Sequence, residues 1–152
     1  MAESAVQPSL TYRDPLAAVK WLQDAFGLEI DTLLTDAQGK VGHCVMSLNG
    51  GQVGVMGEWS PGDAAPMKSP LSLGGAGTQF LWATIADVNA HCEQARKSGA
   101  RIIQEPADQF YGDRTYRALD SDGHVWNFRQ KVKAMPEGAL EGMGLTERAP
   151  KK

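Results

Sequence analysis

The same order of predicted elements occurs twice along the chain, and this repeat constrains the fold more than any other feature. In the first half, Asp14 followed by Pro15 is typical of a helix start, and Gly27 ends the helical pattern. In the second half, Asp87 and Gly99 take the same two places. The two starts are 73 residues apart and the two ends are 72 residues apart. This nearly constant offset predicts a duplicated unit.

Each half surrounds its predicted helix with strand-like segments. A short extended segment precedes the helix, and three apolar runs bounded by turn residues follow it, which is typical of a meander. The predicted strands are 7–12, 29–35, 41–48 and 52–58 in the first half, and 79–85, 100–104, 115–119 and 124–130 in the second. We therefore predict an α+β fold of two βαβββ modules in tandem.

Changes in composition divide the chain into four segments. The first module is assigned to 7–58 and the second to 79–130. Between them, 59–78 is rich in Pro and Gly, which predicts a linker loop. The last segment, 131–152, has no sustained apolar stripe, and we expect a surface arm or a dimer contact.

Charge and composition argue against several classes of protein. The chain has 15 Lys and Arg against 18 Asp and Glu, a net charge of −3, which does not suit a nucleic-acid partner. The first residues do not resemble a signal peptide, and no apolar run is long enough to span a membrane, so we expect a cytoplasmic protein with no membrane partner. Cys44 and Cys92 are too few for a disulfide scaffold and are expected to be buried apolar side chains.

The most specific motif lies near the end of the second half. Tyr-Gly-Asp-Arg at 111–114 is followed by Asp-Ser-Asp-Gly-His-Val-Trp at 120–126. With the order of elements, this motif resembles the vicinal oxygen chelate (VOC) superfamily, glyoxalase/bleomycin resistance protein type, over residues 7–130. That superfamily usually has Pro where this chain has Ser121. The resemblance implies a homodimer, and curved mixed sheets with helices on their convex faces and a ligand cavity on the concave side.

The resemblance also implies where a divalent metal would bind, on the first and last strands of each module. The matching positions hold Gln7 in the first module and Phe80, or Gln79 after a one-residue slip, in the second; the last strands offer Gly54 or Val55 and Asn127. Divalent metals prefer imidazole or carboxylate ligands, and at most two neutral amides remain here. We therefore predict no metal site and no cofactor; a divalent metal is expected only if the protein is a metal-dependent enzyme.

Strand alternation predicts what lines the cavity instead. It turns Phe80 and Trp82 to the concave face, together with neutral polar side chains. The predicted ligand-binding residues are Gln7, Thr11, Trp59, Phe80, Trp82, Arg114 and Asn127. Such a lining suits a flat organic ligand held by stacking and oriented by hydrogen bonds. Trp59 could instead be a packed loop anchor.

Side chains on one predicted strand near the motif are candidates for binding an anion. Arg114, Tyr116 and Arg117 could each offer one, but one face of a strand cannot carry all three. Arg114 could instead form a local ion pair with Asp113.

Three residues are candidates for acid or base catalysis. His43 is predicted to face the cavity, Glu58 ends a strand, and Tyr111 precedes another. His91 is expected at the surface or the edge of the core, because a helix on the convex face does not easily reach the cavity. His124 belongs to the turn before the last strand and is expected to have a local turn or packing role.

Three functions remain open. The first is binding of a small aromatic molecule in a metal-free cavity, as the resemblance to bleomycin resistance proteins implies. The alternative is a lyase or isomerase of glyoxalase type, either metal-dependent or using His43 or Glu58 for metal-free acid-base chemistry. The third is a non-catalytic module that binds a partner, which is favoured if this protein's own side chains fill the cavity.

Overall fold

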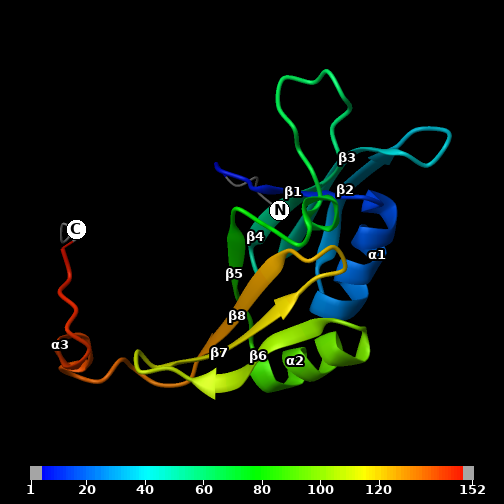
Figure 1. Ribbon diagram of the computed structural model, residues 1–152. Coiled ribbons are helices and arrows are strands. Elements are labelled where there is room, and N and C mark those ends of the chain that lie inside the picture. Colours follow the sequence, from blue (N-terminus) through cyan, green and yellow to red (C-terminus); the bar gives the residue numbers. More distant parts are fainter. Residues whose placement is uncertain (1–4, 149–152) are drawn as a thin grey trace.

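The computed structural model describes residues 5–148, and within them the duplicated plan is present (Figure 1). The first module contains β1 (Ser9–Tyr12), α1 (Pro15–Phe26), β2 (Glu29–Thr35), β3 (Val41–Leu48) and β4 (Gly51–Gly57). The second contains β5 (Phe80–Thr84), α2 (Val88–Lys97), β6 (Arg101–Asp108), β7 (Asp113–Leu119) and β8 (Val125–Lys131). The fold is therefore α+β with two tandem modules, as predicted.

Each module forms one four-stranded mixed sheet. The strand orders are β1-β4-β3-β2 and β5-β8-β7-β6, with the first pair of each sheet parallel and the others antiparallel. Ser9 pairs with Gly54 in the first sheet, and Trp82 pairs with Asn127 in the second. Both positions differ by 73 residues, so the sheets repeat at the offset that the helix starts predict.

The helix ends follow from local capping. The Asp14 carboxylate accepts a hydrogen bond from Ala17 N at 3.1 Å, and Gly27 ends α1 with a φ of 73°. Asp87 caps α2 in the same way. A capping carboxylate satisfies an amide that the helix leaves unpaired, and glycine adopts positive φ without a side-chain clash. These two effects explain why the bounds of α1 were predictable to the residue.

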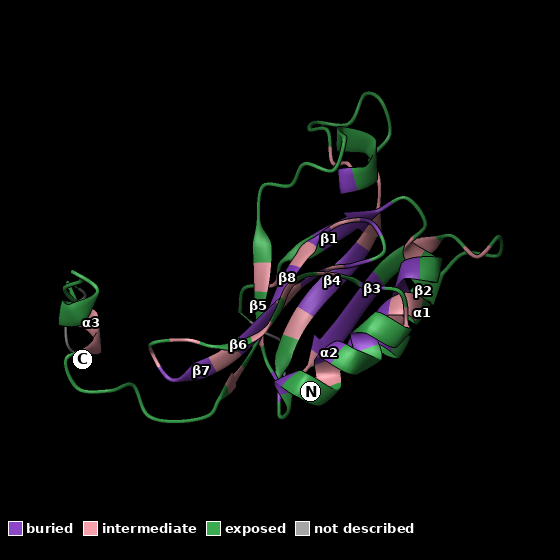
Figure 2. Cartoon of the chain, turned by 60° about the horizontal axis from the view of Figure 1, so that its bottom comes forward, coloured by how far each residue is buried: buried purple, intermediate pink, exposed green. Residues whose placement is uncertain are grey.

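The two modules share one hydrophobic core. Phe26, at the end of α1, is fully buried, and its ring centroid lies 4.8 Å from that of Phe128 and 5.3 Å from that of Trp126 in β8. Figure 2 shows buried positions on the inner sides of both helices and along the central strands. Burying an aromatic ring of this size stabilises the folded state by about 2–3 kcal/mol. The contact fixes the two sheets relative to each other.

Several strand bounds differ from the prediction. β1 begins at Ser9, β7 begins at Asp113, and β6 continues to Asp108 instead of ending at 104. The extension of β6 includes Pro106, which an edge strand tolerates because its outer side needs no hydrogen bond donor. Pro106 and its charged neighbours are therefore the reason why the sequence did not predict this part of β6.

The linker and the arm are both partly ordered. Within the linker, residues Pro70–Leu73 form a 3-10 turn that the Ser69 hydroxyl caps, although only a loop was predicted there. The arm leaves the end of β8 and carries the one-turn helix α3 (Ala139–Gly142) away from both sheets (Figures 1 and 2). Within residues 5–148 no helix combines the length and the apolar composition needed to cross a membrane.

Candidate functional site

The concave face of the second sheet exposes large aromatic side chains. Phe80 is 51% exposed and Trp82 is 47% exposed, whereas the alternate residues Leu81 and Ala83 pack against the core. On β8 the alternation buries Trp126 towards the helices. The side chains thus face the way that strand alternation predicts.

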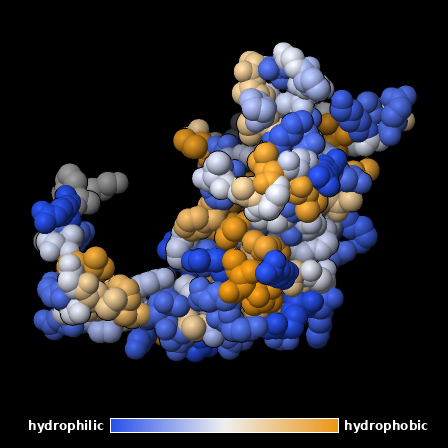
Figure 3. All heavy atoms as spheres, in the orientation of Figure 1, coloured by the Kyte–Doolittle hydropathy of each residue, from blue (hydrophilic) through white to orange (hydrophobic). Residues whose placement is uncertain are grey.

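A cavity of about 580 Å³ covers part of this face, and we call it the second-sheet cavity. Linker residues from Pro66 to Thr78 line one wall, and β5, β6 and β7 supply Phe80, Ile103, Arg117 and Leu119. Apolar side chains gather over this sheet at the centre of the view in Figure 3. The volume lies within the range of about 300–1,000 Å³ that is usual for small-molecule sites.

Polar groups border the apolar floor of the second-sheet cavity. Arg117 Nε donates a hydrogen bond to Asn127 Oδ1 at 3.4 Å, and its guanidinium carbon lies 5.9 Å from the Phe80 ring centroid. Thr11 lines the cavity from β1. Among the described residues, Thr11 Oγ1 and Asn127 Nδ2 are buried side-chain atoms without a hydrogen bond partner. Unsatisfied buried polar atoms are rare, and a bound ligand is one of the ways to satisfy them.

The motif at 120–126 builds the wall where the modules meet. Asp120 accepts hydrogen bonds from the Tyr12 hydroxyl at 2.6 Å and from Trp126 Nε1 at 3.1 Å. Asp122 accepts from the Ser69 hydroxyl at 2.6 Å, which ties the linker to the second module. Burial, with Asp120 beside it, holds the pKa of Tyr12 well above its usual value, so the phenol keeps the proton it donates.

His124, for which the sequence predicts a local turn or packing role, also forms a hydrogen bond to a distant strand. Its Nε2 donates to the backbone oxygen of Thr11 at 2.7 Å, across the boundary between the modules. That bond fixes the strand carrying Thr11 at the end of the second-sheet cavity. Sequence reasoning missed this, because nothing local indicates that a turn residue bonds to a strand 113 positions earlier.

The other predicted ligand-binding residues lie elsewhere in the single chain. Trp82 lines a groove of about 280 Å³ between the two sheets, with Arg129 stacked 5.5 Å from its ring. Gln7 and His43 line a hollow of about 230 Å³ on the first sheet. The single cavity expected from the sequence is therefore divided into separate hollows.

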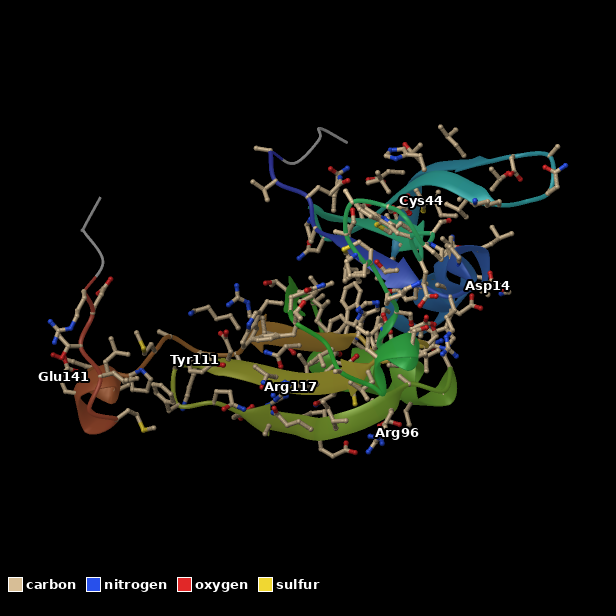
Figure 4. The ribbon with its side chains drawn as sticks, turned by 45° about the horizontal axis from the view of Figure 1, so that its top comes forward. Asp14, Cys44, Arg96, Tyr111, Arg117 and Glu141 are labelled. Carbon is tan, nitrogen blue, oxygen red and sulfur yellow. The ribbon has the colours of Figure 1, made fainter. Side chains whose placement is uncertain are left out.

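Trp59, Tyr111 and Arg114 lie outside these three hollows. Arg114 pairs with Asp108 at 2.7 Å, so the ion pair expected with Asp113 is wrong: β6 extends far enough to place Asp108 opposite Arg114. Trp59 is partly exposed on the linker, and the Tyr111 ring packs edge-on against Phe110. Figure 4 shows Tyr111 displaced from Arg117 towards the C-terminal arm.

The three candidate catalytic residues are not brought together. Glu58 accepts a hydrogen bond from Ser69 N at 3.0 Å, and hydrogen bonds from Ser72 and Ser69 lower the pKa of its carboxyl. A lowered pKa makes the carboxylate a weaker base. His43 is exposed in the hollow of the first sheet. Tyr111 lies far from it, at the end of the second sheet that is nearest the C-terminal arm. Their positions give no shared site for acid-base chemistry.

His91 occupies the edge of the core, one of the two places expected for it. Its Nε2 donates to Phe26 O at 2.8 Å, and its Nδ1 accepts from the Tyr116 hydroxyl. Burial lowers the pKa of this imidazole. His91 therefore joins the two helices and β7, away from the concave face.

The positions at which the fold family implies a metal do not fit one. Gln7 donates to Gln52 Oε1 at 3.4 Å, Phe80 has no donor atom, and a side chain at Gly54 would collide with Ser9. Asn127 supplies only an amide, engaged by Arg117. Across residues 5–148 no group of three or more His, Cys, Asp or Glu side chains is placed to hold a metal ion. These donors do not suit a divalent cation.

Known proteins share both the sequence pattern and the fold. The family model of the glyoxalase/bleomycin resistance protein/dioxygenase superfamily matches residues 5–128. An uncharacterised protein of Mycobacterium bovis is 28% identical over 131 residues, covering 86% of each chain. An uncharacterised protein of Mycobacterium tuberculosis strain H37Rv is equally similar over 86% of this chain and 76% of its own.

Two crystal structures have the same architecture. TioX from Micromonospora sp. ML1 matches with a TM-score of 0.66 and 29% identity, covering 88% of this chain and 100% of its own. TnmS3, an antibiotic binding protein from Streptomyces sp. CB03234, matches with a TM-score of 0.61 and 21% identity over 86% of this chain and 98% of its own. With the family match covering most of its length, the chain belongs to the glyoxalase/bleomycin resistance protein/dioxygenase superfamily.

Proposed function

We propose that the protein binds a small, planar aromatic molecule in the second-sheet cavity, without a metal ion. The observation that carries the proposal is the half-exposed Phe80 ring in the floor of a cavity of about 580 Å³. An exposed aromatic ring in a concave apolar site gains most from a flat partner that covers it. The antibiotic binding function given for TnmS3 is consistent with this use of the fold.

Binding of matched neutral probes tests the aromatic preference. We expect 2-naphthamide to bind more tightly than its saturated decahydro analogue, because only the flat ring stacks. Equilibrium dialysis with mass-spectrometric detection gives both dissociation constants. Phe80→Ala should weaken 2-naphthamide about 5-fold to 10-fold, since an aromatic pair is worth about 1 kcal/mol.

Phe110→Ala is the matched control, because Phe110 is a partly exposed phenylalanine that packs on Tyr111 outside the second-sheet cavity. Binding in Phe110→Ala should equal that of the unaltered protein. Equal losses in both variants, or equal affinity for the flat and saturated probes, would contradict the proposal.

Metal independence rests on the poor donor set and has its own test. Elemental analysis of untagged protein purified without chelator should find less than one equivalent of transition metal per chain. Adding EDTA should leave the affinity for 2-naphthamide unchanged. One tightly bound equivalent whose removal abolishes binding would instead favour the metal-dependent enzyme.

We infer that two copies of the chain associate, as the resemblance implied. The C-terminal arm exposes Met143 and Leu145, and β2 exposes Leu34. Exposed apolar side chains, such as those on an arm that leaves the body of the fold, are typical of surfaces that a partner covers. Light scattering should give twice the 16.4 kDa of one chain. Met143→Asp should weaken association while Leu16→Asp, on α1, does not; a monomer at every concentration would refute the inference.

A further inference from the structure

The charge of the second-sheet cavity differs from that of the whole chain. Its lining includes the basic side chains of Lys68 and Arg117, and none of the lining residues, all within the described part of the chain, is Asp or Glu. The chain as a whole carries a net charge of −3. A basic site in an acidic protein does not follow from composition, and it favours a negatively charged ligand.

Arg117 is the basic group best placed to bind such a ligand. Among the described residues its hydrogen bond is the one from Nε to Asn127, so the two terminal amino groups of the guanidinium have no protein acceptor. No carboxylate of residues 5–148 forms an ion pair with it. The terminal amino groups are the part of arginine that grips a carboxylate with two parallel hydrogen bonds.

Other arginines show that the chain can provide carboxylate partners. Arg96 pairs with Glu105 at 2.6 Å, and Arg114 pairs with Asp108 at 2.7 Å. Arg96 lies on α2 and Arg117 lies on the second sheet (Figure 4). Arg117 has no such partner among the described residues, and at the cavity wall it is held in place by Phe80 and Asn127.

A second polar group lines the same space. The Thr11 hydroxyl is buried at the cavity wall without a hydrogen bond partner among the described residues. Because that oxygen is buried, the groups that the cavity exposes to a ligand are the half-exposed Phe80 ring and the Arg117 guanidinium.

We propose that the ligand of this cavity is an aromatic carboxylate, with its ring on Phe80 and its carboxylate on Arg117. This inference rests on the proposed function and adds the charge of the ligand to it. The ring contact supplies apolar burial, and the bidentate contact fixes orientation. Lys68, on the linker wall, adds to the positive potential.

Three probes that share one ring and differ in charge test the inference. They are 2-naphthoate, 2-naphthamide and 2-naphthylmethylamine, compared by equilibrium dialysis with the full chain at neutral pH. We expect 2-naphthoate to bind about 10-fold to 100-fold more tightly than 2-naphthamide, the range for a hydrogen-bonded charge, and the amine to bind most weakly. Added salt should weaken 2-naphthoate and leave 2-naphthamide nearly unchanged.

Variants assign the preference to one side chain. Arg117→Gln should abolish the preference for 2-naphthoate while 2-naphthamide still binds, and Arg117→Lys should keep part of it. Arg96→Gln is the control, because Arg96 lies on α2 with carboxylate partners of its own. Thermal unfolding checks that each variant folds, and the salt series on the unaltered protein carries the test if Arg117→Gln does not.

The outcomes separate this inference from the proposed function. If 2-naphthamide and 2-naphthoate bind equally and without salt dependence, the aromatic function holds and the anionic ligand is refuted. A preference that survives in Arg117→Gln would overturn the assignment to Arg117. If neither flat probe binds, the proposed function fails, and this inference fails with it.

Discussion

Two buried tyrosines allow a sharp test of the charge-assisted hydrogen bond between the modules, because one bonds across the boundary and the other bonds within the second module. Tyr12 and Tyr116 are both fully buried, and each hydroxyl donates to one side chain. The partner of Tyr12 is the carboxylate of Asp120, whereas the partner of Tyr116 is the imidazole of His91, kept neutral by a pKa that burial lowers. Replacing each by Phe removes one oxygen and keeps the ring.

The two substitutions should lower the free energy of unfolding by different amounts, because the hydroxyls have different partners. Removing a hydrogen bond to a charged group costs about 1.5–3 kcal/mol, and removing a neutral one costs about 1 kcal/mol. Asp120 keeps Trp126 Nε1 and three backbone amides as donors after Tyr12→Phe, so we expect about 2 kcal/mol there. For Tyr116→Phe we expect about 1 kcal/mol. In a domain of this size the melting temperatures fall by about 4–8 °C and 2–4 °C.

Urea unfolding followed by tryptophan fluorescence measures both variants, with thermal unfolding as a second readout. The slope with urea should stay unchanged, because neither substitution alters the surface exposed on unfolding. A cost for Tyr116→Phe equal to or above that for Tyr12→Phe would refute the reasoning. It would mean that the Asp120 carboxylate is not the stronger hydrogen bond partner, and that the Tyr12–Asp120 bond between the modules is not charge-assisted.

Three further predictions concern stability and the linker. Burial lowers the pKa of His91, so stability present at neutral pH is lost as pH falls below about 6.5, and His91→Gln should flatten that dependence in urea unfolding. Gly112→Ala should destabilise by about 2 kcal/mol more than Gly138→Ala in thermal unfolding; both glycines have positive φ, but only at Gly112 would the new methyl group collide with the backbone. Asp122→Ala should speed proteolysis within the linker, 59–78, because it removes the acceptor of a linker hydroxyl.

Local sequence signals predicted the features of the fold that depend on local interactions. The Asp14 cap and the Gly27 stop gave the bounds of α1, and their recurrence gave the duplicated plan. The end of β6 was missed because pairing along the sheet, opposite Arg114, outweighs the poor strand propensity around Pro106. Strand propensity does not register such tertiary pairing.

The candidate site was harder to predict because it depends on contacts distant in sequence. Arg114 and Arg117 looked equivalent along one strand, and only the position of Asp108 separates the paired arginine from the unpaired one. Likewise, the division of the expected cavity depends on the path of the linker, which Asp122 fixes through Ser69. The alternation of side chains along one strand predicts neither the position of Asp108 nor the path of the linker.

The internal repeat also explains why the two sheets differ in what they offer a ligand. At equivalent positions the first sheet has Ser9 lying over Gly54, whereas the second has Trp82 beside Asn127. In the first sheet the Asp31 carboxylate already accepts from Ser47 and Gln52, both at 2.8 Å. The polar groups there satisfy one another, while Arg117 on the second sheet keeps unused donors beside an exposed ring. Because recognition requires unsatisfied groups, the proposed site lies on the second module.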